Sequence, residues 1–117
     1  MDVAPVKPTI STDLLERIDI RVGTITAVAD LPKSDRLVRL EVDFGAFTRT
    51  VLVGMKQERA DPGAIVGCQA LFVVNLEPRR LMGVLSEAML FDIGHADGLI
   101  PVLAVPEGPV PNGTRGG

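Results

Sequence analysis

Two short stretches in which apolar and polar residues alternate constrain the fold of this chain more than any other feature. Residues 37–43 (Leu-Val-Arg-Leu-Glu-Val-Asp) alternate over seven positions, and residues 48–54 follow after a turn that contains Gly45. A period of two places successive side chains on opposite faces of a strand, so both stretches predict half-buried β-strands. The short connection between them favours direct antiparallel pairing. The sequence therefore predicts a β-hairpin.

The other apolar segments are also strand-sized, and turn residues separate them. Their expected bounds are residues 20–28, 69–76, 84–93 and, as a short extra strand, 99–105. A short helix is expected over residues 13–17, capped by Ser11 or Thr12. Five main strands whose only long connection follows the third are in the order of an OB-fold barrel, although small sandwiches and SH3-like barrels give similar patterns. We expect an all-β fold, a five-stranded OB-fold barrel with a short N-terminal helix and an irregular C-terminal extension.

Length and composition fit one small domain. The 117 residues are 46% hydrophobic, mostly Val, Leu, Ile and Ala, with four Phe and no Trp or Tyr. Short branched side chains suit the interior of a small barrel. Residues 1–11 contain two prolines and no periodicity, so we expect a flexible N-terminal segment there and one domain over residues 12–117.

Residues that catalysis or metal binding would require are scarce. The single histidine, His95, lies in a Gly-His-Ala-Asp-Gly turn, and the single cysteine, Cys68, precedes an apolar strand, where we expect it to be buried. No spacing of His, Cys, Asp or Glu matches a metal site, and no glycine-rich loop precedes a helix. We expect no enzymatic activity, no metal and no cofactor. Without a signal-peptide pattern or a membrane-length apolar run, we expect a cytoplasmic protein with no membrane contact.

The charge of the chain is unevenly distributed. The net charge of −3 argues against a nucleic-acid ligand, but residues 33–80 hold eight Lys and Arg against six Asp and Glu. Nine of the twelve basic residues are Arg, whose planar side chain suits phosphates and base edges. A mixed, solvated surface is the alternative interpretation.

In an OB fold, the loop between strands one and two and the loop between strands four and five border one binding face. In this chain both loops carry polar and basic residues, which we expect to converge on one patch. The candidate ligand-binding residues are Lys33, Arg36, Arg39, Lys56, Asn75, Arg79, Arg80 and Ser86. Arg49 is expected to face solvent beside Arg39, opposite the inward-facing apolar residues.

These residues also have structural interpretations. Glu41 can neutralise a neighbouring arginine, and Asn75 and Ser86 can hold their loop together through hydrogen bonds to the backbone. Met55 and Met82 are expected to pack rather than to bind a ligand.

Several segments resemble the tRNA-binding-domain family, which includes the C-terminal domain of bacterial methionyl-tRNA synthetases. Asp19–Ile25 (Asp-Ile-Arg-Val-Gly-Thr-Ile) resembles the opening of that family, and Ser34–Leu37 resembles its entry into the second strand. Asn75–Gly83 followed by Leu85–Met89 resembles its most characteristic block. The resemblance extends over nearly the whole chain and implies an OB fold, tRNA as a ligand and no catalysis.

Within this family, Gly54–Gln57 and Val110–Arg115 are most similar to the CsaA-type export chaperones. That resemblance implies a homodimer and a role with unfolded or precursor polypeptides. The expected dimer interface consists of Leu14, Leu15, Ile18, Val110 and Pro111. Three functions stay open: a chaperone for polypeptides, a tRNA-binding protein, and a module that docks onto an aminoacyl-tRNA synthetase or another complex.

Overall fold

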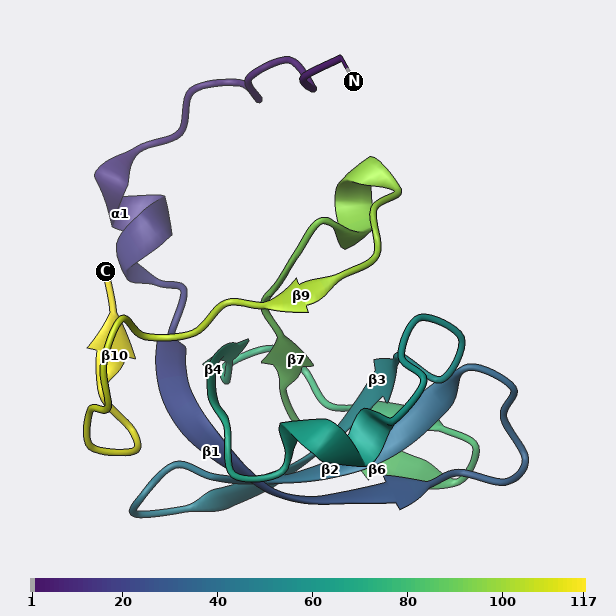
Figure 1. Cartoon of the computed structure of the whole chain (residues 1–117). Helices are drawn as coiled ribbons and strands as arrows, with labels where there is room; N and C mark the ends of the chain where they lie inside the picture. Colours follow the sequence, from purple (N-terminus) through teal and green to yellow (C-terminus); the bar gives the residue numbers. More distant parts are fainter. Residues whose placement is uncertain (1) are drawn as a thin grey trace.

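The computed structural model describes residues 2–117 and is built around one curled antiparallel sheet with strand order β3-β2-β1-β4-β7 (Figure 1). Its strands are β1 (Ile20–Asp30), β2 (Leu37–Asp43), β3 (Thr48–Gly54), β4 (Gln69–Val73) and β7 (Met89–Leu90). The first half of β1 pairs with β4 and the second half with β2, with an irregularity in register between Ile25 and Ala27. One long bent strand thus belongs to both walls of a barrel.

The barrel closes where β3 meets β6 (Val84–Ser86). The backbone N–H of Leu52 donates to Ser86 Oγ at 3.0 Å, and the N–H of Glu87 donates to the carbonyl of Thr50 at 2.8 Å. The N–H of Thr50 in turn donates to Glu87 Oε1 at 2.9 Å. These bonds satisfy the free edge of β3. The predicted OB-type barrel and the hairpin over residues 37–54 are confirmed.

The core is made of the inward-facing residues of the curled sheet. Its largest fully buried side chains are Phe44, Phe72, Ile25, Leu40, Val42 and Val51. The rings of Phe44 and Phe72 meet edge to face at 5.5 Å. Gly23 is required beside them, because a Cβ on this residue would lie 2.6 Å from Val42 Cγ1 and 2.7 Å from the Phe44 ring. Met55 is buried, as predicted.

The region after β4 differs from the expected pattern. The expected strand over residues 84–93 is divided into β6, β7 and β8 (Asp92–Ile93), which pair with β5 (Arg79–Leu81), β4 and β9 (Val102–Leu103), respectively. The predicted loop over residues 77–83 therefore contributes a strand. A run of apolar residues does not reveal that the chain changes its pairing partner twice. The strand expected over residues 69–76 likewise ends at Val73.

The N-terminal segment and helix lie apart from the barrel (Figure 1). Residues 2–11 are exposed and contain no helix or strand, and α1 (Thr12–Glu16) begins where Ser11 Oγ accepts from the N–H of Leu14 at 3.3 Å. Within residues 2–117 no helix is long and apolar enough to cross a membrane.

The C-terminal tail is irregular but fixed to the barrel. It ends in β10 (Arg115–Gly116), which pairs with β1. Asn112 Oδ1 accepts from Thr24 Oγ1 at 2.7 Å and from Gln69 Nε2 at 3.0 Å. Two 3₁₀ turns, η1 (Pro62–Ile65) and η2 (His95–Asp97), complete the elements.

Candidate nucleic-acid interface

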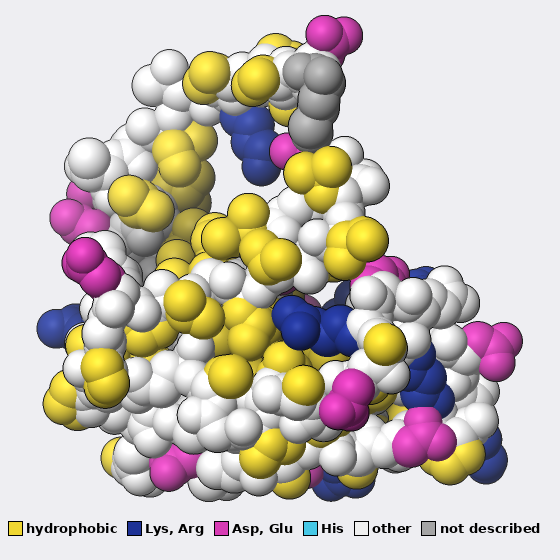
Figure 2. Space-filling model, in the orientation of Figure 1, with side chains coloured by type: hydrophobic (Ala, Val, Ile, Leu, Met, Phe, Trp, Pro, Cys, Tyr) yellow, Lys and Arg dark blue, Asp and Glu magenta, His cyan; other side chains and the backbone are white. Residues whose placement is uncertain are grey.

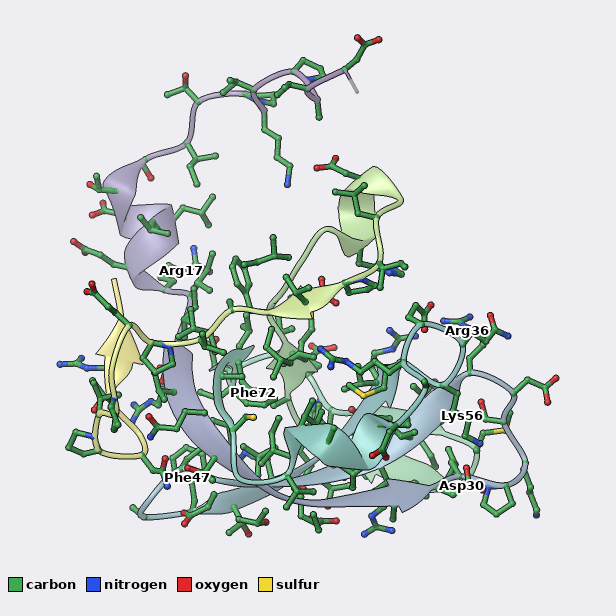
Figure 3. All side chains as sticks on the ribbon, viewed as in Figure 1. Arg17, Asp30, Arg36, Phe47, Lys56 and Phe72 are labelled. Atoms are coloured by element: carbon green, nitrogen blue, oxygen red, sulfur yellow. The ribbon has the colours of Figure 1, made fainter. Side chains whose placement is uncertain are left out.

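The loop over residues 31–36 is held in place by Lys56. The Lys56 ammonium donates to the carbonyls of Leu31 at 2.9 Å and Ser34 at 2.7 Å, and it forms an ion pair with Asp30 (Figure 3). Three acceptors within the chain therefore surround this cation. Lys56 shapes the loop in this structure, and its charge is largely compensated.

Ser34 fixes the same loop from inside. Its side chain is buried, and its Oγ accepts from the N–H groups of Arg36 at 3.2 Å and Leu37 at 2.9 Å. Lys33 and Arg36 are exposed on either side of it. The Arg36 guanidinium approaches the end of β3, because a Cβ on Gly54 would lie 3.3 Å from Arg36 Nη2.

Asn75 and Ser86 use their polar atoms within the fold. Asn75 Oδ1 accepts from the N–H of Asp19 at 2.9 Å, and Asn75 Nδ2 donates to the carbonyl of Arg17 at 2.7 Å. Ser86 Oγ accepts from Leu52 across the barrel seam. Both side chains thus have the structural contacts that the sequence left open as the alternative to ligand binding.

The β5–β6 hairpin presents two arginines. Arg79 pairs with Ser86 and Arg80 with Leu85, and both arginines are exposed. Arg80 Nη1 donates to the carbonyl of Gly83 at 3.3 Å. No carboxylate among residues 2–117 forms an ion pair with either guanidinium. Both therefore remain available to an anionic ligand.

Arg39 is exposed on β2, and its Nε donates to Glu41 Oε1 at 2.9 Å. The side chains of this pair are 43% and 40% exposed, so water screens the attraction. Arg39 can therefore exchange the Glu41 carboxylate for the phosphate of a ligand at little cost in free energy.

The topology brings the loop and the hairpin to the same part of the barrel. β3 lies between β2 and β6, and the contacts of Thr50 with Glu87 and of Leu52 with Ser86 show that β6 runs antiparallel to β3. The β5–β6 tip therefore extends toward the Gly54 end of β3, where Lys56 holds the loop over residues 31–36. The exposed basic side chains of this region, called the exposed basic group below, are Lys33, Arg36, Arg39, Arg79 and Arg80.

Arg49 does not join this group, and the expectation that it faces solvent beside Arg39 is wrong. Arg49 pairs with Val42 across the hairpin and so shares the inward face of that residue. Its Cζ lies 4.7 Å from the centroid of the Phe47 ring, and its Nε is buried without a hydrogen-bond partner among the described residues. Because Arg49, Val51 and Val53 alternate along one strand, the sequence already indicates that Arg49 shares the inward face of the two valines.

A second arginine covers the same ring. Arg21 Cζ lies 5.9 Å from the Phe47 centroid, and its guanidinium donates to both carboxylate oxygens of Asp19, at 2.9 and 3.1 Å. The hydrogen bond to Asp19 raises the pKa of Arg21 above its ordinary value. Phe47, Arg21, Arg49 and Asp19 are called the Phe47 cluster below. Phe47 directly precedes β3 and Arg49 is its second residue, whereas Lys56 follows the strand, so the cluster lies at the opposite end of β3 (Figure 3).

Residues 2–117 contain no group of three or more His, Cys, Asp or Glu side chains that could hold a metal ion. His95 lies exposed in η2. Cys68 is also exposed, so the prediction that it is buried is wrong. Val66 and Gly67 separate it from η1, and its side chain lies outside the buried core.

The residues expected at a dimer interface are distributed over both termini. Leu14, Leu15 and Ile18 are 42%, 55% and 41% exposed, and Pro111 is also exposed. Val110 is half-buried, and its backbone exchanges hydrogen bonds with the amide of Gln69. Figure 2 shows hydrophobic side chains on both sides of an opening between the N-terminal segment and the barrel.

Comparison with proteins of known sequence supports a single family assignment. Residues 20–115 match the family model described as a putative tRNA binding domain. The chain is 37% identical over 99 residues to a methionine–tRNA ligase from Bacteroides fragilis and 39% identical over 104 residues to one from Chloroherpeton thalassium. These alignments cover 85% and 89% of this chain but only 14% and 15% of the ligases.

Solved structures give the same result at the level of the fold. A methionyl-tRNA-synthetase-related protein from Pyrococcus horikoshii superposes with a TM-score of 0.85 at 29% identity, covering 93% of this chain and 98% of that one. The chaperone CsaA from Bacillus anthracis superposes with a TM-score of 0.80 at 29% identity, covering 94% and 100%. The match of the family model over most of the chain shows that the protein belongs to the tRNA-binding-domain family.

Proposed function

We propose that this protein binds tRNA without catalysing a reaction, through the exposed basic group. The observation that carries the proposal is that Lys33, Arg36, Arg79 and Arg80 are exposed and form no ion pair with a carboxylate among residues 2–117. They come from the loop over residues 31–36 and from the β5–β6 hairpin, both of which lie toward the Gly54 end of β3. Exposed cations of this kind can contact the phosphates of a folded RNA.

The net charge of the chain limits the strength of this interaction. At −3, the rest of the protein repels a polyanion, so affinity depends on a few local contacts. We expect binding that weakens steeply with salt, because each phosphate contact releases counterions. We also infer that the protein is cytoplasmic, which is the location that a tRNA ligand would favour.

The test is a tRNA titration at several salt concentrations with Arg79→Ala/Arg80→Ala. Loss of two phosphate contacts is expected to weaken binding by about tenfold or more and to reduce the slope of log affinity against log salt by roughly one to two. The control, Arg17→Ala/Arg115→Ala, removes the same charge from exposed positions outside the group. Equal affinities for the two double variants would contradict the proposal.

A second candidate function is the binding of unfolded or precursor polypeptides. It is supported by the likeness to CsaA and by exposed apolar side chains around β8 and β9, such as Phe91, Ile93 and Ile100. Apolar binding of this kind responds little to salt, so an unfolded-peptide titration on the same sample separates the two functions. A protein that binds neither ligand would instead fit a module that docks onto a synthetase.

We also infer that the protein is a homodimer whose interface includes Leu14, Leu15, Ile18, Val110 and Pro111. Leu14 and Leu15 lie on α1, and Ile18 lies just after it. The helix is too short to be stable unsupported, and all three apolar side chains are exposed. Leu15→Asp is expected to yield monomers in sedimentation. Val66→Asp, at a residue that is 48% exposed next to η1, is the matched control and is expected to leave the dimer intact.

A further inference from the structure

The tip of the β5–β6 hairpin adopts a backbone conformation that its sequence does not favour. Leu81 pairs with Val84, so Met82 and Gly83 form a two-residue turn with φ angles of 51° and 78°. Among residues 2–117, Met82 is the only residue other than glycine with a positive φ. Two positive φ angles are the signature of a type I′ turn, in which Asn-Gly is preferred. Methionine is strained at this position, and Asn would relieve part of that strain.

Packing does not account for this methionine. Its side chain is 53% exposed, so the prediction that Met82 packs in the protein is wrong, in contrast to the buried Met55. A Cβ added to Gly83 would meet nothing within 4 Å, which shows that the tip extends into open space. The fold thus holds a long apolar side chain in solvent, in a conformation that favours other residues.

The neighbours of Met82 indicate what this side chain contacts. Arg79 and Arg80 are exposed on the strand that leads to the turn, and Leu85, which is 38% exposed, lies opposite Arg80. An apolar tip beside two cations on the same hairpin matches a nucleotide, whose phosphate is anionic and whose base has an apolar face. A thioether packs favourably against an aromatic ring.

We propose that Met82 is an RNA-contact residue that packs its thioether against the face of an unpaired base. The inference rests on the proposed tRNA-binding function and adds a base contact to the phosphate contacts of the arginines. Unpaired bases are the parts of a folded RNA whose faces are accessible to a side chain.

The experiment compares Met82→Asn with the wild type in thermal unfolding and in tRNA titration. Relief of backbone strain is expected to raise the Tm by about 3 °C. Loss of the long apolar side chain is expected to weaken tRNA binding about fivefold. The salt slope should stay unchanged, because no phosphate contact is removed. A variant that is more stable but binds tRNA less well would show that Met82 serves binding at a cost in stability.

Controls separate this inference from the function on which it rests. Met82→Leu keeps an apolar side chain and should bind tRNA within twofold of the wild type, while Met82→Gly should behave like the Asn variant. A blunt RNA duplex, which has no unpaired base, should bind the wild type and Met82→Asn equally.

Each outcome is informative. If Met82→Asn raises the Tm without weakening tRNA binding, while Arg79→Ala/Arg80→Ala does weaken it, the inference fails and the proposed function stands. Equal weakening on the duplex overturns the base contact. A wild-type protein that binds no tRNA overturns both proposals together.

Discussion

The two ends of β3 both carry arginines, yet the surroundings of these arginines differ. The exposed basic group lies toward the Gly54 end, and four of its five members form no ion pair with a carboxylate among residues 2–117. In the Phe47 cluster, two guanidinium groups share one aromatic ring, and one of them has its own carboxylate. Stacking and pairing leave a guanidinium fewer donors for a ligand. The number of arginines in a sequence therefore says little about recognition until their surroundings are known.

This contrast assigns different roles to the two ends. The Phe47 cluster covers one end of the barrel, where the Phe47 ring stacks on the buried Phe44 at 5.2 Å. Its arginines lie over an aromatic core, and their aliphatic chains cover apolar surface. The exposed basic group covers no core. Substitutions in the cluster should change stability, and substitutions in the group should change binding.

The largest effect is expected from Phe47→Ala. This substitution removes a half-buried ring and the face over which Arg21 and Arg49 lie, and we expect it to destabilise the protein by about 2–3 kcal/mol in urea unfolding. Binding of tRNA by the folded protein should stay within twofold of the wild type. The matched control is Phe91→Ala, at a ring that is 43% exposed, for which a smaller loss of stability is expected. A stable Phe47→Ala protein that had lost tRNA binding would reverse the assignment of the two ends.

An intermediate effect is expected from Lys56→Met. The substitution removes the cation that binds Asp30 and the carbonyls of Leu31 and Ser34, and we expect about 1–2 kcal/mol of lost stability because these acceptors lose their partner. Affinity for tRNA should fall severalfold as the loop loosens, whereas the salt slope should hardly change.

Lys33→Met provides the comparison for Lys56. Lys33 is exposed in the same loop and makes no ion pair among the described residues. Its loss should leave the free energy of unfolding unchanged and lower the salt slope by about 0.7–0.9, as expected for one phosphate contact. If Lys56→Met lowered the slope by the same amount, Lys56 would be a ligand contact rather than a support for the loop.

The sequence predicted those features that depend on neighbouring residues. The β2–β3 hairpin followed from a local period of two, and Arg79 and Arg80, expected as basic residues of a ligand-binding loop, are exposed. The breaks between β6, β7 and β8 were missed because each depends on a strand elsewhere in the chain. Long-range pairing is not encoded in a local apolar pattern.

The same distinction applies to the candidate site. Lys56 and Asn75 were identified as ligand candidates from their residue types, but their partners lie 25 and 58 residues away, at Leu31 and Arg17. Such contacts appear only once the fold is known. Arg49 is a different case, because its alternation with Val51 already placed it on the inward face.

The smallest effects are expected from a matched pair of substitutions on the central hairpin, Arg39→Gln and Arg49→Gln. Arg39 has a screened, exposed partner in Glu41, so its loss should change stability by less than about 0.5 kcal/mol and weaken tRNA binding about twofold to threefold. Arg49 lies over Phe47, so its loss should cost about 1 kcal/mol of stability and leave binding unchanged.

Both substitutions remove one positive charge from neighbouring strands, so a general electrostatic effect on RNA would lower both affinities equally. If Arg49→Gln lowers stability in urea unfolding and Arg39→Gln weakens binding in tRNA titration, the face on which an arginine lies decides its role. If Arg49→Gln weakened binding as much as Arg39→Gln does, the ligand would extend over the Phe47 end as well. The contact surface would then span the full length of β3.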